Sequence, residues 1–200
     1  TRKESSAASD VYKRQDRYAS NRPLYIGEDV LRTVKYADPQ NPNSHQLPAK
    51  HKLHEQSSNV QGTVLWYAAA VVNNPGNYAK LLQNNYWRYP ALQPLMPFID
   101  DKAPKKPRSL KASWSDDGCL LHWKAPKGKG WENEAYKYVV YRFGPDEEID
   151  LDNPTKIVAI TYQPALRLNY NGGETKYTYV VTALDRMSNE SVGKKKKIRL

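Results

Sequence analysis

Short runs that alternate apolar and polar residues fill the last part of the chain, from Pro104 to Leu200. Successive side chains of a strand point to opposite faces, so such runs, separated by turn residues, are typical of strands that pack as a β-sandwich. Asp-Asp-Gly, Gly-Lys-Gly, Gly-Pro and Asn-Gly-Gly supply the turns. The runs are SLKASW, CLLHW, YKYVVYRF, KIVAI, ALRLNY, YTYVVTAL and KKIRL. The sequence therefore predicts an all-β sandwich at residues 104–200.

Prolines separate this region from the residues before it. Five of them lie between Tyr89 and Arg108, where they exclude a continuous helix or a central strand and favour extended backbone. We place a domain boundary near Ala103, which gives a first domain at residues 16–103 and a second at 104–200. Residues 1–15 are polar and show no apolar periodicity, so we interpret them as a disordered tail or as an artefact that does not belong to the protein.

The first domain shows strand and helix patterns in alternation. LYIGEDV is a short apolar strand, and a helix is expected from near Ser44, with Pro48 in its first turn. GTVLWYAAAVV is uncharged and is interpreted as a buried parallel strand running into a loop, and NNPGNYAKLLQNNYW has helical spacing. The order predicts a parallel α/β arrangement.

The composition restricts the chemistry. Hydrophobic residues make up 39% of the 200 residues, which is enough for ordinary cores. The single cysteine, Cys119, excludes an internal disulfide and a thiolate metal cluster, and we expect it to be a small buried hydrophobe. No transmembrane segment and no targeting signal are expected in this chain. No cofactor is expected.

The positive charge raises the question of nucleic acid. The net charge is +10, and most of the excess lies in residues 104–200. These charges are scattered among acidic residues without a nucleic-acid motif, so no specific nucleic acid is expected as a partner, although a basic nucleic-acid binder is one alternative function. Lys194 to Lys197 are expected on an edge strand that lysine keeps soluble, and an anion-binding role is the alternative.

The C-terminal domain resembles fibronectin type III domains over nearly its full length. CLLHWKAP with Trp123 is similar to the second strand, and YTYVVTALDRMSNES to the sixth strand and its turn. The resemblance implies that Tyr177 is the corner tyrosine, whose hydroxyl bonds to upstream backbone. We expect Trp114, Trp123 and Trp131 to be core and loop-packing residues, with a ligand cage as the alternative.

The N-terminal domain resembles the C-terminal end of the glycosyl hydrolase-like 10 family of bacterial proteins. The similar residues are LYIGEDV, NVQGTVLWYAAAVVNNPGNYAKLLQNNYWRYPALQPLMPFID and APKKP. The resemblance implies a (β/α)8 TIM barrel followed by a sandwich, with LYIGEDV and GTVLWYAAAVV as its seventh and eighth strands. The fold class expected for the chain is thus a partial α/β domain, the last two β/α units of a TIM barrel, plus the all-β fibronectin type III-like sandwich.

This resemblance also implies a site. Barrel enzymes carry their active groups at the C-terminal ends of the strands, so Glu28, Asp29, Trp66 and Tyr67 are the expected substrate-binding residues. Carboxylates can bond sugar hydroxyls, and an indole face can stack on a pyranose. Alternatively, Glu28 and Asp29 cap the following helix, and one of the two aromatic residues faces the core. The catalytic residues are unknown and are expected outside this chain.

Three histidines suggest a metal site that the spacing does not support. His51 and His54, with His45 and Glu55 nearby, share a helix face, but the metalloprotease pattern places its two histidines four residues apart. A solvated helix face is the expected explanation, and no metal site is predicted.

These observations give one leading function and two alternatives. The chain is expected to be the C-terminal fragment of a bacterial glycoside hydrolase-like protein that acts on carbohydrate, and the fragment alone is expected to be inactive. In that parent protein the location would be extracytoplasmic, either periplasmic or on the cell surface with a lipid anchor, and the sandwich could contact other surface proteins. The alternatives are a non-catalytic module that binds protein or carbohydrate, and the nucleic-acid binder.

Overall fold

The computed structural model of the chain describes residues 22–116, 118–128, 130, 134–170 and 172–200. The chain divides into two compact units, Thr1–Arg88 and Tyr89–Leu200. We call them the α/β unit and the sandwich unit, and each is described by itself. The predictions for residues 1–15 and for Trp131 lie outside the described residues.

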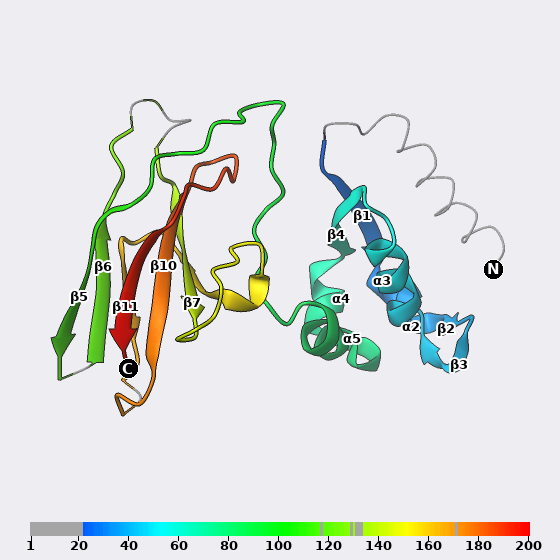
Figure 1. Cartoon of the computed structure of the whole chain (residues 1–200). Helices are drawn as coiled ribbons and strands as arrows, with labels where there is room; N and C mark the ends of the chain where they lie inside the picture. The colour runs from blue at the N-terminus through cyan, green and yellow to red at the C-terminus, as the bar shows by residue number, and fades with distance from the viewer. Residues whose placement is uncertain (1–21, 117, 129, 131–133, 171) are drawn as a thin grey trace. The chain divides into compact units, whose positions relative to one another are not determined.

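The α/β unit alternates strands and helices in the predicted order. Its elements are β1 (Leu24–Asp29), α2 (Val30–Lys35), β2 (Ala37–Asp38), β3 (Asn41–His45), α3 (Leu47–Glu55), β4 (Val60–Trp66), α4 (Ala68–Val72), η1 (Pro75–Asn77), α5 (Tyr78–Leu81) and η2 (Leu82–Tyr86) (Figure 1). β1 and β4 pair in parallel and, within the described part of the chain, make up the whole of their sheet. The predicted parallel pairing is confirmed.

The prediction for GTVLWYAAAVV is wrong in two respects. The strand β4 ends at Trp66, and Ala68–Val72 form the helix α4 where a loop was expected. The strand is not buried, because Val64 and Trp66 are exposed. The run of alanines favours a helix, and a two-stranded pair leaves one of its faces uncovered by the helices.

The core of the α/β unit is small. Five buried hydrophobic side chains form it among the described residues, and Leu65 of β4 packs against them. They are Val30, Leu47, Ala70, Tyr78 and Leu82. The predicted helical spacing of Tyr78 and Leu82 is confirmed by their burial, and Pro48 lies in the first turn of α3 as predicted.

The sandwich unit contains seven strands within the described residues, as predicted. They are β5 (Arg108–Ser115), β6 (Gly118–Lys124), β7 (Lys137–Phe143), β8 (Ile157–Thr161), β9 (Ala165–Leu168), β10 (Lys176–Leu184) and β11 (Lys194–Arg199) (Figure 1). One sheet has the order β5-β6-β9 and the other the order β11-β10-β7-β8, and neighbouring strands are antiparallel. Two packed antiparallel sheets of three and four strands are a sandwich of the immunoglobulin and fibronectin type III kind.

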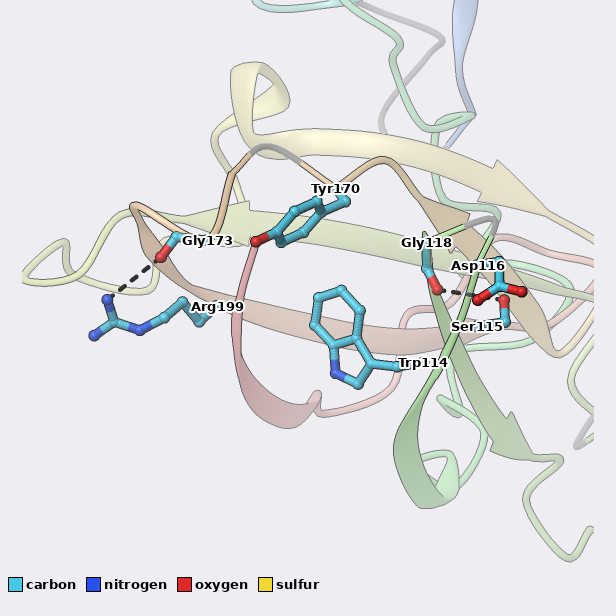
Figure 2. A pocket seen from close by; sticks show the side chains of 7 residues that line it. All are labelled: Trp114, Ser115, Asp116, Gly118, Tyr170, Gly173 and Arg199. Carbon is cyan, nitrogen blue, oxygen red and sulfur yellow. Dashed lines mark hydrogen bonds between the residues drawn. The ribbon is translucent and has the colours of Figure 1, made fainter.

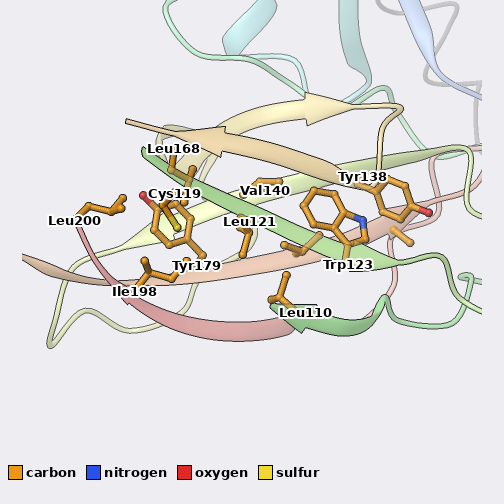
Figure 3. Packing of buried hydrophobic residues seen from close by; sticks show 12 residues of the cluster. Leu110, Cys119, Leu121, Trp123, Tyr138, Val140, Leu168, Tyr179, Ile198 and Leu200 are labelled. Atoms are coloured by element: carbon orange, nitrogen blue, oxygen red, sulfur yellow. The ribbon is translucent and has the colours of Figure 1, made fainter. Parts of the chain in front are cut away.

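Both sheets contribute to the main core of the sandwich (Figure 3). Its described members are Leu110, Cys119, Leu121, Trp123, Tyr138, Val140, Leu168, Tyr179, Val181, Ala183, Ile198 and Leu200. The rings of Trp123 and Tyr138 meet edge to face, with centroids 5.3 Å apart. The core positions predicted for Trp123 and Cys119 are confirmed, and burial raises the pKa of the Cys119 thiol.

A second buried cluster lies on the other face of the four-stranded sheet. It includes Val139, Tyr141 and Phe143, which alternate along β7 with the residues of the main core, and Leu92 packs against it. The Tyr141 hydroxyl donates to Glu190 Oε1 at 2.7 Å, and burial together with this bond raises the pKa of Tyr141. Part of the segment before β5 thus belongs structurally to the sandwich unit.

Two further expectations concern β10 and β11. Lys194–Arg199 form an edge strand of the four-stranded sheet, as predicted. Tyr177 is half-buried beside Tyr179, and the guanidinium of Arg142 lies 5.0 Å from its ring centroid. Its hydroxyl bonds to none of the described residues, so the corner hydrogen bond that the resemblance implies is not found among them.

Candidate functional site

The candidate site lies at the carboxyl ends of β1 and β4. The two strands pair with Glu28 opposite Leu65 and Asp29 opposite Trp66. Directly paired residues share a face of the sheet, so Asp29 and Trp66 lie on one face and Glu28 on the other. Leu65 packs into the core of the α/β unit, so the face that Glu28 shares is the one covered by helices.

The open face presents two aromatic rings. The side chain of Trp66 is 67% exposed, and that of Tyr67 is exposed as well. The ring centroids are 6.3 Å apart and the planes meet at 66°. The alternative interpretation, in which one of these two aromatic residues faces the core, is therefore wrong, because both rings are exposed. Two exposed rings beside a carboxylate can provide a stacking surface and a hydrogen-bond acceptor for one ligand.

Asp29 begins the helix α2. Its Oδ1 accepts from the backbone N–H of Arg32 at 3.0 Å, and its Oδ2 lies 3.7 Å from Arg32 Nε. The helix-capping interpretation is therefore confirmed for Asp29. A carboxylate has about four acceptor positions, so this partly exposed side chain can still accept hydrogen bonds from a ligand.

Glu28 belongs to a buried polar cluster that also contains Thr33, Lys50 and Tyr78. The Thr33 hydroxyl lies 3.0 Å from Glu28 Oε1 and also accepts from Lys50 Nζ. Lys50 Nζ is itself 3.8 Å from Glu28 Oε1. The ammonium partly compensates the charge of a carboxylate that water does not reach. Successive strand residues face opposite sides of a sheet, so the sequence could have predicted that Glu28 and Asp29 lie on different faces. Nothing in the sequence around Lys50 indicates that its ammonium approaches Glu28.

Two oxygens in this cluster are buried without a hydrogen bond of ordinary geometry to the described residues. They are Glu28 Oε2 and the Tyr78 hydroxyl. Burial first, and then the charge of Glu28 and the approach of its carboxylate to the phenol, raise the pKa of Tyr78 far above its ordinary value, so the phenol stays neutral. Buried polar atoms without partners are rare, and a bound water or a neighbouring group usually satisfies them.

The histidines do not form a metal site among the described residues. His51 is buried and stacks on Tyr86, with ring centroids 4.2 Å apart, while His54 Nδ1 lies 3.3 Å from the Thr63 hydroxyl. Burial lowers the pKa of both rings, and the Glu28 charge opposes this shift. The expected solvated helix face is therefore wrong for His51, because α3 packs that ring against η2.

The arrangement is suited to binding more than to hydrolysis. Glycoside hydrolysis requires two carboxylates that face each other, about 5–9.5 Å apart, across the scissile bond. Asp29 stands at the open face, whereas Glu28 is enclosed on the opposite face. The described residues of this unit thus offer an aromatic surface with one accessible carboxylate.

The chain is similar to a bacterial glycosyl hydrolase along most of its length. That relative is the "Glycosyl hydrolase YngK" of Bacillus subtilis (strain 168), and the two are 31% identical over 180 residues. The match covers 88% of this chain and 34% of the relative, so the chain spans about a third of its length. The chain is thus a glycosidase-related sequence that carries a β-sandwich.

Solved structures similar to the chain include fibronectin type III domains. A "Fn3-like protein from Clostridium thermocellum" is 24% identical, with a TM-score of 0.35 over 48% of this chain and 92% of that chain. The "FN5 domain of Drosophila Lar" is 19% identical, with a TM-score of 0.33 over 48% of this chain and 98% of that chain. The strand order given above, and not these low scores, defines the sandwich.

No protein-family model matches the chain. Among the described residues, none of the helices is long and apolar enough to span a membrane.

Proposed function

We propose that this chain is the C-terminal part of a bacterial glycoside hydrolase-like protein of the glycosyl hydrolase-like 10 type. In that parent protein β1 and β4 are the seventh and eighth strands of a (β/α)8 barrel, and the sandwich is an accessory module. The observation that carries the proposal is the parallel pair that places Asp29 beside the exposed Trp66 at the strand ends. The glycosyl hydrolase relative supports the same class of substrate.

Each site residue has a proposed role. The indole of Trp66 stacks on the apolar face of a sugar ring, Tyr67 extends that surface, and Asp29 accepts hydrogen bonds from sugar hydroxyls. For Glu28, the bonds to Thr33 and the approach of Lys50 favour a supporting role, in which it fixes the end of β1 against α2 and α3. The catalytic acid and nucleophile come from barrel strands outside this chain, so the chain alone turns over no glycoside. The parent is proposed to act outside the cytoplasm, with a lipid anchor as one arrangement.

The test uses the full-length parent protein, encoded by the gene that contains this segment. Hydrolysis of 4-methylumbelliferyl glycosides of glucose, galactose, xylose and N-acetylglucosamine is measured for the wild type and for Trp66→Ala and Asp29→Ala. We expect each variant to lower kcat/KM by about tenfold or more, the value of one lost stacking or hydrogen-bond contact. Val72→Ala is the control, since Val72 is exposed on α4 and is not at the strand ends.

Three results would contradict the proposal. They are an upstream gene segment without further β/α units, full activity of the Trp66→Ala parent, and a parent that binds glycans without hydrolysing any. The last result would favour the non-catalytic binding module.

A further inference from the structure

An open pocket lies at one end of the sandwich unit, and none of the residues of the site above line it (Figure 2). Its volume is about 490 Å³, within the range of about 300–1,000 Å³ that is usual for small-molecule sites. Residues from the end of β5, the start of β6, the loop between β9 and β10, and the end of β11 line it. They are Trp114, Ser115, Asp116, Gly118, Tyr170, Gly173 and Arg199.

Trp114 continues the inward-facing positions of β5, but its side chain is exposed. Along β5 the inward positions are those of Leu110 and Ala112, and Trp114 continues this alternation opposite the buried Cys119. Its side chain is nevertheless 53% exposed, because β5 ends there. Of the two packing roles expected for the sandwich tryptophans, core and loop packing, Trp114 has the second, because its ring contacts Tyr170 in the loop after β9.

Tyr170 provides a second exposed ring, two residues beyond β9. Its side chain is 59% exposed, and its ring meets that of Trp114 at 85° with centroids 5.7 Å apart. Edge-to-face contact is a favoured arrangement of two aromatic rings. The two rings thus form a right-angled apolar corner.

Two glycines allow close approaches in the wall of the pocket. A Cβ on Gly173 would lie 3.0 Å from the Tyr170 hydroxyl, and one on Gly118 would lie 2.9 Å from the carbonyl oxygen of Leu168. Both residues also have positive φ, +73° and +107°, which residues with side chains rarely adopt. A side chain at position 173 would press on the Tyr170 ring, and one at position 118 would collide with the backbone at the end of β9.

Polar groups of both kinds flank the rings. Figure 2 shows Arg199 with Gly173 on one side of the ring pair and Ser115 with Asp116 on the other. Arg199 Nη1 donates to the Gly173 carbonyl oxygen at 3.4 Å and forms no ion pair with the described residues, which leaves further N–H donors for a ligand. The Asp116 carboxylate supplies acceptors.

We propose that this pocket binds a pyranose unit of a neutral oligosaccharide. A pyranose has an apolar C–H face that stacks on an indole, and its edge of hydroxyls both donates and accepts hydrogen bonds. The indole of Trp114 takes the face, Tyr170 forms the side wall, and Asp116 and Arg199 take the hydroxyls. The inference relies on the proposed function only for the class of ligand. The sandwich would then hold the parent protein on a glycan independently of the barrel site.

The test measures binding of the full chain to cellohexaose, xylohexaose, maltohexaose and chitohexaose by saturation-transfer NMR and tryptophan fluorescence. We expect at least one of them to bind saturably, and Trp114→Ala and Tyr170→Ala each to weaken its binding by about tenfold. Tyr162→Ala is the matched control, because Tyr162 is 60% exposed and pairs edge to face with Tyr136 at 5.3 Å. It lies in the same unit but does not line the pocket.

A second control separates this inference from the proposed function. In a Trp66→Ala background, which removes the proposed barrel contact, the saturable binding that remains should still weaken about tenfold with Trp114→Ala or with Tyr170→Ala. If Trp66→Ala abolishes binding and neither pocket variant weakens it, the sandwich pocket is refuted and the barrel site stands. The inference is overturned if no probe binds, or if both pocket variants bind like wild type with native amide-exchange protection. The two rings would then only cover the end of the core. This conclusion would hold even if the parent hydrolyses glycosides.

Discussion

The two units of this chain bury very different cores. Within the described residues, the sandwich unit has clusters of twelve and six buried hydrophobic side chains, one on each face of its four-stranded sheet. The α/β unit has one cluster of five, beside a buried polar cluster around Glu28. A β-sheet needs about three strands, or a well-packed helix layer, for independent stability, and β1 and β4 are only two.

The difference shows how function and stability are distributed. The sandwich has the covered faces and paired strands of a domain that folds alone. The α/β unit leaves Val64 and Trp66 exposed on a face that the helices do not cover, and it holds buried polar atoms without partners. If the proposed function is correct, the remaining strands and helices of the barrel would cover those groups.

The largest expected effect comes from separating the units. Expressed alone, residues 89–200 should unfold in one reversible, cooperative transition, because both hydrophobic clusters of the sandwich remain intact. Residues 22–88 should associate or melt without cooperativity, because the open face and strand edges are exposed. Calorimetry and amide exchange on the two pieces measure this difference. A monomeric 22–88 piece with a sharp transition would show that the α/β unit is a complete domain.

The sequence predicted the sandwich well because its signals are local. Alternation and turn residues specify each of the seven strands, and both depend on neighbours along the chain. The position of a residue at a strand end is not a local signal, so the sequence did not distinguish the exposed Trp114 from the buried Trp123. The helix of Ala68–Val72 was missed because an apolar run can be strand or helix until its packing is known. Neighbouring residues of a strand face opposite sides of the sheet, so the separation of Glu28 from Asp29 could have been predicted.

The second prediction concerns a polar turn of the sandwich. Asp185 is buried, and its carboxylate accepts from the backbone N–H groups of Met187 and Asn189 at 2.8 and 2.9 Å and from Asn189 Nδ2 at 2.9 Å. Asp185→Ala leaves these donors unpaired, so we expect the free energy of unfolding to fall by about 3 kcal/mol. Urea unfolding of the sandwich measures it. Asp146→Ala, at an exposed position, is the control and should change little.

The third prediction is that the α/β unit loses stability in mild acid. Burial lowers the pKa of His51 and of His54 in the folded state below the unfolded value of about 6.5, against the opposing charge of Glu28. Between the two values the unfolded state binds more protons, so stability is complete above about pH 6.5 and declines as the pH falls toward the folded pKa values. Amide-exchange protection of α3, corrected for intrinsic rates, should decrease over this window.

A variant distinguishes this effect from general acid sensitivity. His51→Phe keeps a ring against Tyr86 and removes one titrating group, so the decrease in α3 protection with falling pH should become shallower. The amides of β10 in the same molecule serve as the internal reference. An unchanged pH dependence in His51→Phe would show that His51 contributes nothing to it.

The smallest expected effect tests whether a single hydroxyl stabilises the sandwich. The Tyr177 hydroxyl bonds to none of the described residues, and the ring is held by contacts with Tyr179 and Arg142 that phenylalanine would largely keep. We therefore expect Tyr177→Phe to change the free energy of unfolding by less than about 0.5 kcal/mol. Tyr141→Phe is the matched control, because it removes the 2.7 Å bond to Glu190 and should cost about 1–2 kcal/mol. An equal loss in both variants would mean that Tyr177 makes the corner bond after all.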